Sequence, residues 1–199
     1  MSGTTTPGPA MPGLPTLGDL PWAPALDHPD LLAPPVAAAL AAWAARDDRV
    51  RGLVAVTEID PDHADTATLN DRHGLPPEAS ANCVVVAGRR GDAERVAACV
   101  VTAATFADVN TRVRKLLDAR KASFLPTDRA TTESGMEHGG ITPVGLPPQW
   151  RVLVDSRFAA PGALALMGSG VRRSKLLMPG ELLCAMPGVE VVEGLGVAR

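Results

Sequence analysis

The sequence predicts an α+β fold: a single domain with a mixed, largely antiparallel sheet flanked by short helices. Short runs of β-branched and aliphatic residues are interspersed with short helical segments, and turn-forming residues separate them. Long βαβ crossovers, which a parallel sheet would require, are absent from this pattern. At 199 residues the chain has the length of one domain with a substantial core.

The first 25 residues differ in composition from the rest of the chain. They are rich in Pro, Gly and Thr, and they hold too few apolar side chains to offset the entropy lost on ordering. We therefore expect residues 1–25 to form a disordered or loosely packed extension and residues 26–199 to form the domain. Trp22 is the side chain expected to attach the end of this extension to the domain.

Prolines, a glycine and the alternation of large with small residues predict the first two helices and the strand between them. Two prolines precede an alanine-rich run at 36–45, a position where the start of a helix tolerates proline. Valines that alternate with smaller residues predict a strand over 53–59. Asp62 or Asp65 can cap a short helix that Gly74 ends.

A hairpin and a helix are expected next. Apolar runs at 83–87 and 96–102 are separated by the polar segment 88–92, which predicts a β-hairpin. Asp108 can cap a helix whose apolar residues share one face. These residues fall at i, i+4, i+7 and i+8: Val109, Val113, Leu116 and Leu117.

The second half of the chain carries short apolar runs typical of strands. We expect strands at 122–125, 151–155, 163–167 and 175–178, a short helix at 181–186 and a last strand at 190–192.

Charge and composition restrict the class of function. The net charge of −3 argues against a general nucleic-acid binder, whose domain is usually basic, although a local basic strip is compatible with it. With three Trp, three Phe and no Tyr, aromatic platforms for stacked bases are scarce.

The sequence indicates neither a metal site nor a bound cofactor. Its three cysteines are widely spaced and form no Cys-x-x-Cys pair, and His28, His63 and His73 have no ligand-like spacing with cysteines or carboxylates. Reduced thiols, the lack of an 18-residue apolar run and the lack of a signal-peptide pattern predict a cytoplasmic protein that does not enter a membrane.

The most informative segment runs from Gly135 to Gly145 and reads Gly-Met-Glu-His-Gly-Gly-Ile-Thr-Pro-Val-Gly. Its glycines permit backbone angles closed to other residues, while Pro143 has a restricted φ and no N–H. Apolar runs lie on both sides of it. The segment is therefore expected to be a shaped loop inside the domain, where a ligand can approach the main chain closely.

The pattern Gly-x-x-x-Gly-Gly-Ile-Thr-Pro-x-Gly resembles the signature loop of the YbaK/prolyl-tRNA-synthetase-associated domain family, the aminoacyl-tRNA editing deacylases. A second segment, Met167-Gly168-Ser169-Gly170 followed by Ser174-Lys175-Leu176, resembles the second glycine-containing loop of that family. The resemblance covers residues 36–192.

The resemblance implies a stand-alone editing domain that hydrolyses the ester of a mischarged tRNA, with Ala- or Cys-tRNA(Pro) as the favoured substrate. Such hydrolysis needs a positioned water and donors for the developing oxyanion. The backbone N–H groups of Gly139 and Gly140, together with those of 168–170, are the expected donors. The residues expected to bind substrate are His138, Ile141, Thr142, Pro143, Gly145, Gly168, Ser169 and Gly170.

Three basic residues follow the second glycine loop directly. Arg172, Arg173 and Lys175 are expected to contact phosphates of the tRNA acceptor end, which would position the tRNA without reading its sequence. The implied partners are an aminoacylated tRNA acceptor end and, as a second partner, an aminoacyl-tRNA synthetase.

Side-chain catalysis has little support in the sequence. Imidazole is a common general base, but His138 can equally be an exposed loop residue, because nothing places a carboxylate beside it. No Gly-x-Ser-x-Gly motif surrounds Ser169 or Ser174, so a serine nucleophile is not indicated.

The sequence departs from the family pattern at Asn82. In the resembling family a lysine usually opens the strand that follows the helix ending here at Gly74, and Asn82 stands in its place. Asparagine offers a neutral amide instead of a positive charge. Two hypotheses therefore stay open: an editing enzyme in which Asn82 takes part in catalysis, and a catalytically silent module that binds a nucleotide, a small amino-acid derivative or a synthetase.

Overall fold

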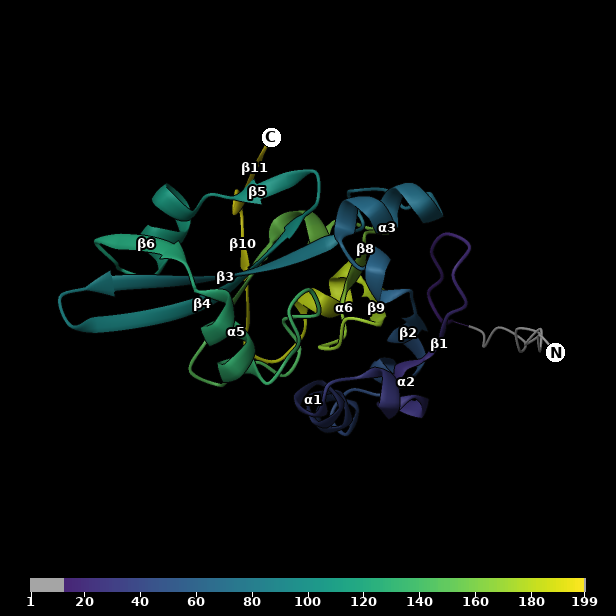
Figure 1. Ribbon diagram of the computed structural model, residues 1–199. Coiled ribbons are helices and arrows are strands. Elements are labelled where there is room, and N and C mark those ends of the chain that lie inside the picture. Colours follow the sequence, from purple (N-terminus) through teal and green to yellow (C-terminus); the bar gives the residue numbers. More distant parts are fainter. Residues whose placement is uncertain (1–12, 199) are drawn as a thin grey trace.

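The computed structural model describes residues 13–198, which form a four-stranded sheet, a five-stranded sheet and a two-stranded ribbon (Figure 1). The four-stranded sheet is antiparallel and has the order β1-β2-β9-β8. Its strands are β1 (Ala23–Pro24), β2 (Ala55–Glu58), β9 (Ser174–Pro179) and β8 (Leu164–Gly168).

The five-stranded sheet is mixed and has the order β10-β7-β4-β3-β6. Neighbours are parallel from β10 to β4 and antiparallel from β4 to β6. Its strands are β10 (Val189–Val192), β7 (Arg151–Asp155), β4 (Ala93–Thr102), β3 (Ala81–Arg90) and β6 (Lys121–Phe124). The predicted α+β class is confirmed, with the strands divided between two principal sheets.

The remaining elements are short. The ribbon pairs β5 (Thr105–Ala107) with β11 (Gly196–Ala198). The helices are α1 (Pro34–Ala44), α2 (Arg49–Leu53), α3 (Thr66–His73), α4 (Arg114–Leu116), α5 (Thr127–Ser134) and α6 (Gly180–Cys184). Strands β1, β5 and β11 and helices α2 and α5 were not predicted. Helix α5 reads Thr-Asp-Arg-Ala-Thr-Thr-Glu-Ser, which has no apolar periodicity.

Capping side chains set the helix ends as the sequence indicated. Asp65, not Asp62, caps α3, since its carboxylate accepts a hydrogen bond from the Thr68 N–H at 3.0 Å. Gly74 ends the helix in the left-handed region at φ +60°. Asp108 accepts from the N–H groups of Thr111 and Arg112, but the turn that it caps, Val109–Val113, is π-helical and only one short α-helical turn follows.

The longest strands, β3 and β4, form the predicted hairpin and extend away from β2, β8 and β9 (Figure 1). Strand β6 pairs only with the second half of β3, from Val86 to Arg89. One further bond, from the Leu125 N–H to the Val85 carbonyl at 2.8 Å, ends this pairing. Pro126 then directs the chain into α5, so the first residues of β3 have no neighbouring strand on that side.

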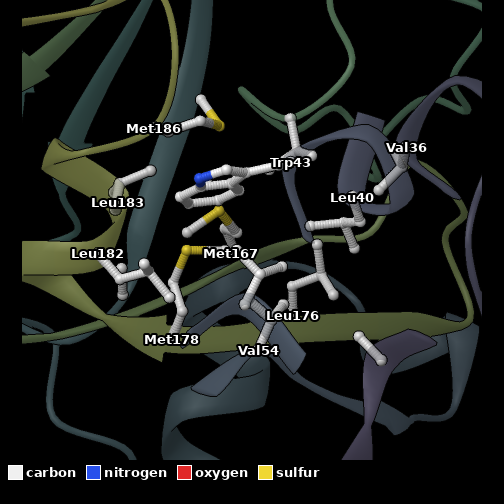
Figure 2. Close-up of a cluster of buried hydrophobic side chains, with 14 of the residues drawn as sticks. Val36, Leu40, Trp43, Val54, Met167, Leu176, Met178, Leu182, Leu183 and Met186 are labelled. Carbon is white, nitrogen blue, oxygen red and sulfur yellow. The ribbon is translucent and has the colours of Figure 1, made fainter. Parts of the chain in front are cut away.

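The largest core cluster joins α1 and α6 to the inner faces of the sheets. Trp43 of α1 is 5% exposed, and Figure 2 shows its indole ring surrounded by Met167, Met178, Met186 and Leu183. Flexible thioether side chains fill irregular space around an aromatic ring and interact favourably with it. Few aromatic residues are needed because methionine, leucine and valine fill this core.

The N-terminal segment is described from residue 13 onward, so residues 1–12 of the predicted extension lie outside the described residues. Leu14, Leu17, Leu20 and Trp22 pack, partly buried, against the cluster that contains Leu69. Within 13–198, no helix has the length and apolar character needed to cross a bilayer.

Replacement of Trp43 by alanine tests the main cluster. We expect Trp43→Ala to lower the free energy of unfolding by about 3–5 kcal/mol, because it removes a buried ring and leaves a cavity. Denaturant unfolding followed by circular dichroism measures this loss. Phe124→Ala is the control: Phe124 is 63% exposed, so its loss should change stability by less than about 0.5 kcal/mol. An equal effect of the two substitutions would contradict the role given to Trp43.

Candidate functional site

A cavity of about 490 Å³ lies beside the first half of β3. It is bounded by the start of α3, by α5, by the loop that follows α5 and by the end of β8. Its lining is apolar in large part, with Leu69, Val84, Leu125, Ile141 and Met167 among the contributing residues. Ligand sites commonly have volumes of about 300–1,000 Å³, so this cavity is of the size of a small-molecule site.

The cavity exists because β6 stops short. The Val85 carbonyl accepts from Leu125, so the peptide groups of Val85 point toward β6. Peptide groups of alternate residues point to the same side of an antiparallel strand, and those of Cys83 therefore face the side that β6 leaves open. Cys83 and Thr127 of α5 both line the cavity, which lies where β6 would have continued.

The two glycine loops recognised in the sequence are joined by main-chain hydrogen bonds. The Glu137 N–H donates to the Gly170 carbonyl at 2.8 Å, and the Gly170 N–H donates to the Gly140 carbonyl at 2.8 Å. The Gly140 N–H in turn donates to the Glu137 carbonyl at 3.0 Å. The Glu137 carboxylate adds a bond from the Arg172 N–H at 2.6 Å.

Glycine is required where these loops meet. A Cβ at Gly168 would overlap the Gly140 carbonyl oxygen, and a Cβ at Gly140 would lie 2.8 Å from the Val171 carbonyl group. Gly139 has a φ of +80°, a region that other residues rarely adopt. The sequence pattern therefore reflects a close approach between two loops.

This interlock corrects one expectation about catalytic donors. The Gly140 N–H closes a turn within the first loop and the Gly170 N–H bonds to that loop, so neither is open to a ligand. Gly139 and Ile141 line the cavity, and no backbone partner is assigned to their N–H groups among residues 13–198. These two are the better candidates for main-chain donors.

The predicted substrate-binding residues divide into two groups. His138, Ile141 and Gly168 line the cavity. The others do not line it and belong to the body of the two loops: Thr142, Pro143, Gly145, Ser169 and Gly170. Ser169 is fully buried, and its hydroxyl lies 2.6 Å from the Ser174 hydroxyl, so it is part of the loop and not of the cavity wall.

Neither His138 nor Cys83, which could act as base or nucleophile at the cavity, has an activating partner in the described part of the chain. His138 is exposed at the cavity, and none of residues 13–198 offers it a carboxylate partner. Desolvation by the surrounding protein raises the pKa of the Cys83 thiol, which lines the cavity. A thiol with a raised pKa is a poor nucleophile. Within 13–198, no group of three or more His, Cys, Asp or Glu could hold a metal ion.

Asn82 lies in the cavity wall, as a site residue would. Its Oδ1 accepts a hydrogen bond from the Thr66 hydroxyl at 2.8 Å. With its carbonyl oxygen used in this way, its amide nitrogen is the group left to meet a ligand.

Lys175 also lies in the cavity wall, whereas we expected it on a surface that contacts RNA phosphates. Its residue is only 7% exposed, and its Nζ donates to the Ala64 carbonyl at 2.8 Å. Burial, and to a lesser extent the nearby Arg172, lower the pKa of its ammonium group from 10.5 to about 8, while Asp65 opposes this. The sequence feature that could have indicated this buried position is a single lysine within the apolar run of β9, Ser-Lys-Leu-Leu-Met-Pro.

The two arginines before Lys175 have different environments. Arg172 lines the cavity, and its Nε donates to the Pro61 carbonyl at 2.9 Å. Arg173 forms an ion pair with Glu58 at 2.8 Å and donates to the Asp30 carbonyl. Of the two, Arg172 is therefore the one placed to meet a ligand in the cavity.

Sequence reasoning missed Phe124. This last residue of β6 lines the cavity and is 63% exposed. A large aromatic side chain that faces solvent at a cavity is unusual, and the strand end at Pro126 places it there. No local pattern in the sequence distinguishes it from a buried strand residue.

Comparisons with known proteins agree with this fold. Residues 60–184 match the model of the aminoacyl-tRNA editing domain family. Among solved structures, one described as a candidate trans-editing enzyme for prolyl-tRNA synthetase is 17% identical, with a TM-score of 0.64 over 81% of this chain and 97% of that one. The hypothetical protein APE2540 is 16% identical, with a TM-score of 0.66 over 80% of this chain and 99% of that one. No curated protein sequence matches the chain.

The buried ammonium group should make stability depend on pH. Because the folded state lowers the pKa of Lys175 from 10.5 to about 8, folding carries a penalty below pH 8 that disappears as pH rises toward 10.5. We expect Lys175→Met to raise the free energy of unfolding at pH 7 by about 1–3 kcal/mol, less whatever the lost bond to Ala64 contributes. This gain should shrink between pH 8 and 10.5.

Denaturant unfolding at several pH values measures the effect. The exposed Lys115 supplies the matched control, since Lys115→Met makes the same chemical change outside the cavity and should alter stability by less than about 0.5 kcal/mol. A Lys175→Met variant that is destabilised equally at every pH would contradict the burial penalty.

Proposed function

The chain belongs to the aminoacyl-tRNA editing domain family, and we propose that it is a stand-alone deacylase that hydrolyses the ester of a mischarged tRNA. The observation that carries the proposal is the cavity beside β3, which is enclosed by both glycine loops and contains a buried lysine. A strongly perturbed ionisable group in a largely apolar cavity is typical of a functional site.

The reaction requires a water, an electrophilic carbonyl and donors for the oxygen that becomes negative. Water attacks the ester carbon, the bond from this carbon to the ribose oxygen breaks, and the products are a free amino acid and a tRNA with an intact terminal ribose. The N–H groups of Gly139 and Ile141 are preorganised by the loop interlock, which is the property that oxyanion donors need. No side-chain nucleophile takes part in this scheme.

The proposed substrates are tRNA(Pro) molecules that carry alanine or cysteine. Synthetases separate small apolar amino acids poorly by binding energy alone, so a second site that hydrolyses the wrong product is useful. The likeness to a candidate trans-editing enzyme for prolyl-tRNA synthetase supports this choice of tRNA, and with it a synthetase as partner and the cytoplasm as location.

Phe124 supplies a surface for the terminal base of the tRNA in this proposal. An exposed aromatic ring stacks with any nucleobase and adds affinity without sequence preference. Arg172, which is partly exposed at the same cavity, can meet the adjoining phosphate. The net charge of −3 then implies that binding depends on these few local contacts.

A second candidate function follows from Asn82. This neutral side chain lies in the wall of the cavity at the position where the resembling family has a lysine. A chain that lost the required charge would keep the cavity and bind a nucleotide, an amino-acid derivative or a synthetase without hydrolysing an ester.

Hydrolysis assays separate the two functions. Purified protein is incubated with tRNA(Pro) charged separately with alanine, cysteine, serine or proline, and the loss of each ester is followed over time. We expect alanyl- or cysteinyl-tRNA(Pro) to be hydrolysed faster than the background and prolyl-tRNA(Pro) to be spared. If a folded sample hydrolyses none of the four, the deacylase proposal for this tRNA is wrong and the binding module is favoured.

The stacking role of Phe124 has its own test. We expect Phe124→Ala to weaken binding of the acceptor end by about 1–3 kcal/mol, the usual contribution of one stacked base. A minihelix with 2-aminopurine as its terminal base reports stacking directly, because fluorescence is quenched on contact with the ring. Phe106, which is 51% exposed and does not line this cavity, is the matched control. Equal behaviour of Phe106→Ala and Phe124→Ala would rule out stacking on Phe124.

A further inference from the structure

The cavity wall holds a cation, Lys175, for which residues 13–198 supply no carboxylate in an ion pair. Within this range its Nζ makes one hydrogen bond, to the uncharged carbonyl of Ala64. Asp65 is close enough to influence it, but the Asp65 carboxylate accepts from the Thr68 N–H as the cap of α3 and is exposed. A buried charge without a partner is costly, so the fold keeps this group despite its penalty.

The segment from Ala64 to Thr66 positions two donors. The Ala64 carbonyl holds the Lys175 ammonium group, which has three N–H bonds and uses one of them there. Two residues later the Thr66 hydroxyl holds Oδ1 of Asn82 and leaves its amide nitrogen for a ligand. Lys175 and Asn82 both line the cavity. One short segment therefore holds a charged donor and a neutral donor in the same wall.

We propose that Lys175 and Asn82 together bind the ester carbonyl oxygen of the aminoacyl-adenosine and stabilise the negative charge that this oxygen gains. This assignment rests on the proposed deacylase function. As water adds to the ester carbon, the carbonyl electron pair moves onto the oxygen that faces the ammonium group. When the pair returns, the bond to the ribose oxygen breaks, and that oxygen takes up the proton released by the attacking water.

The position of Lys175 favours the ester over a phosphate. Lys175 is 7% exposed, whereas Arg172 at the same cavity is partly exposed. The phosphate of the terminal nucleotide continues into the RNA, which is too large for a cavity of about 490 Å³. The phosphate therefore belongs at the mouth, beside Arg172, while the ester enters the cavity and reaches Lys175.

Steady-state kinetics with alanyl-tRNA(Pro) test the assignment. We expect Lys175→Met to lower kcat about 100-fold or more with KM changed by less than about threefold, since the interaction strengthens only as the oxygen becomes negative. Lys115→Met should leave both constants unchanged. A rise in KM at constant kcat, or a loss confined to substrates that carry the 5′-phosphate of the terminal nucleotide, would overturn the assignment in favour of a phosphate contact.

The pH dependence separates an ammonium group from a free amine. After subtraction of background hydrolysis, the rate should fall above about pH 8, where Lys175 loses its proton, and this fall should be absent in Lys175→Met. Arg172, Asp65 and His138 also face the cavity. A fall in rate that the wild type shows and Lys175→Met lacks is nevertheless due to Lys175, because this is the one group that the substitution removes. A rate that rises to a plateau above pH 8 would show that the free amine acts as a base, and the assignment would be wrong.

A positional exchange tests the pairing of the two residues. The double variant Lys175→Met/Asn82→Lys moves the charge from β9 to β3 across the same cavity. We expect it to regain at least about tenfold of the rate lost in Lys175→Met. A Lys175→Met variant with full activity would exclude the proposal.

Binding of non-reactive analogues keeps this assignment separate from the deacylase proposal. Adenosine that carries an aminoethylphosphonate ester has an anionic oxygen at the place of the carbonyl, and the corresponding amide has a neutral one. The wild type should prefer the phosphonate, and Lys175→Met should lose most of this preference. If Lys175→Met loses the preference for the phosphonate but the wild type hydrolyses no ester, the carbonyl-oxygen site is supported and the deacylase function is wrong. An unchanged preference would overturn the site alone.

Discussion

The interlock of the two glycine loops is the constraint on which the site depends. Three main-chain hydrogen bonds join Glu137, Gly140 and Gly170, and they form only because Gly168 and Gly140 have no side chain at the point of contact. The same segment is tied to the start of α1, since the Ala33 N–H donates to the Ser169 carbonyl at 3.1 Å. The loop after α5, the turn between β8 and β9 and the first helix are therefore held as one unit. This unit also explains why two of the expected donors are engaged in the structure of the site and are not open to a ligand.

The cavity itself is a consequence of how β6 ends. Pro126, with a φ of −52°, directly precedes the polar helix α5, and the chain turns into this helix instead of continuing the strand. The edge of β3 is left open over its first residues, and α5 covers the space without filling it. Unpaired strand edges are usually protected from other chains. Here the open edge faces a cavity inside the domain, so its peptide groups are available to a ligand and shielded from aggregation.

The buried positive charge of Lys175 lowers the stability of the folded protein and supports the proposed ester hydrolysis. Lys175 lies on a strand whose following residues are apolar, and its ammonium group is held by a carbonyl and not by a carboxylate. A carboxylate partner would neutralise the positive charge of the ammonium group. A carbonyl partner instead fixes the position of this group and leaves its electric field directed into the cavity. Asn82 lies on β3, in the other sheet, and presents its amide group to the same cavity. The β3 position that carries a lysine in the resembling family is thus neutral here, while a lysine enters the same cavity from β9.

The sequence by itself determined the class of fold, most strands and helices, the caps at Asp65, Gly74 and Asp108, and the two glycine loops, because these depend on local periodicity and on backbone angles that few residues permit. It did not indicate α5, whose polar sequence is stabilised by what surrounds it, or the exposure of Phe124. Only the tertiary structure decided that Lys175 lines the cavity and that Thr142, Pro143, Gly145 and Ser169 do not. The physical reason is that pairing of β9 with β8 and with β2 sets which way Lys175 points, and both β2 and the Ala64 carbonyl that holds its ammonium group lie far from it along the chain.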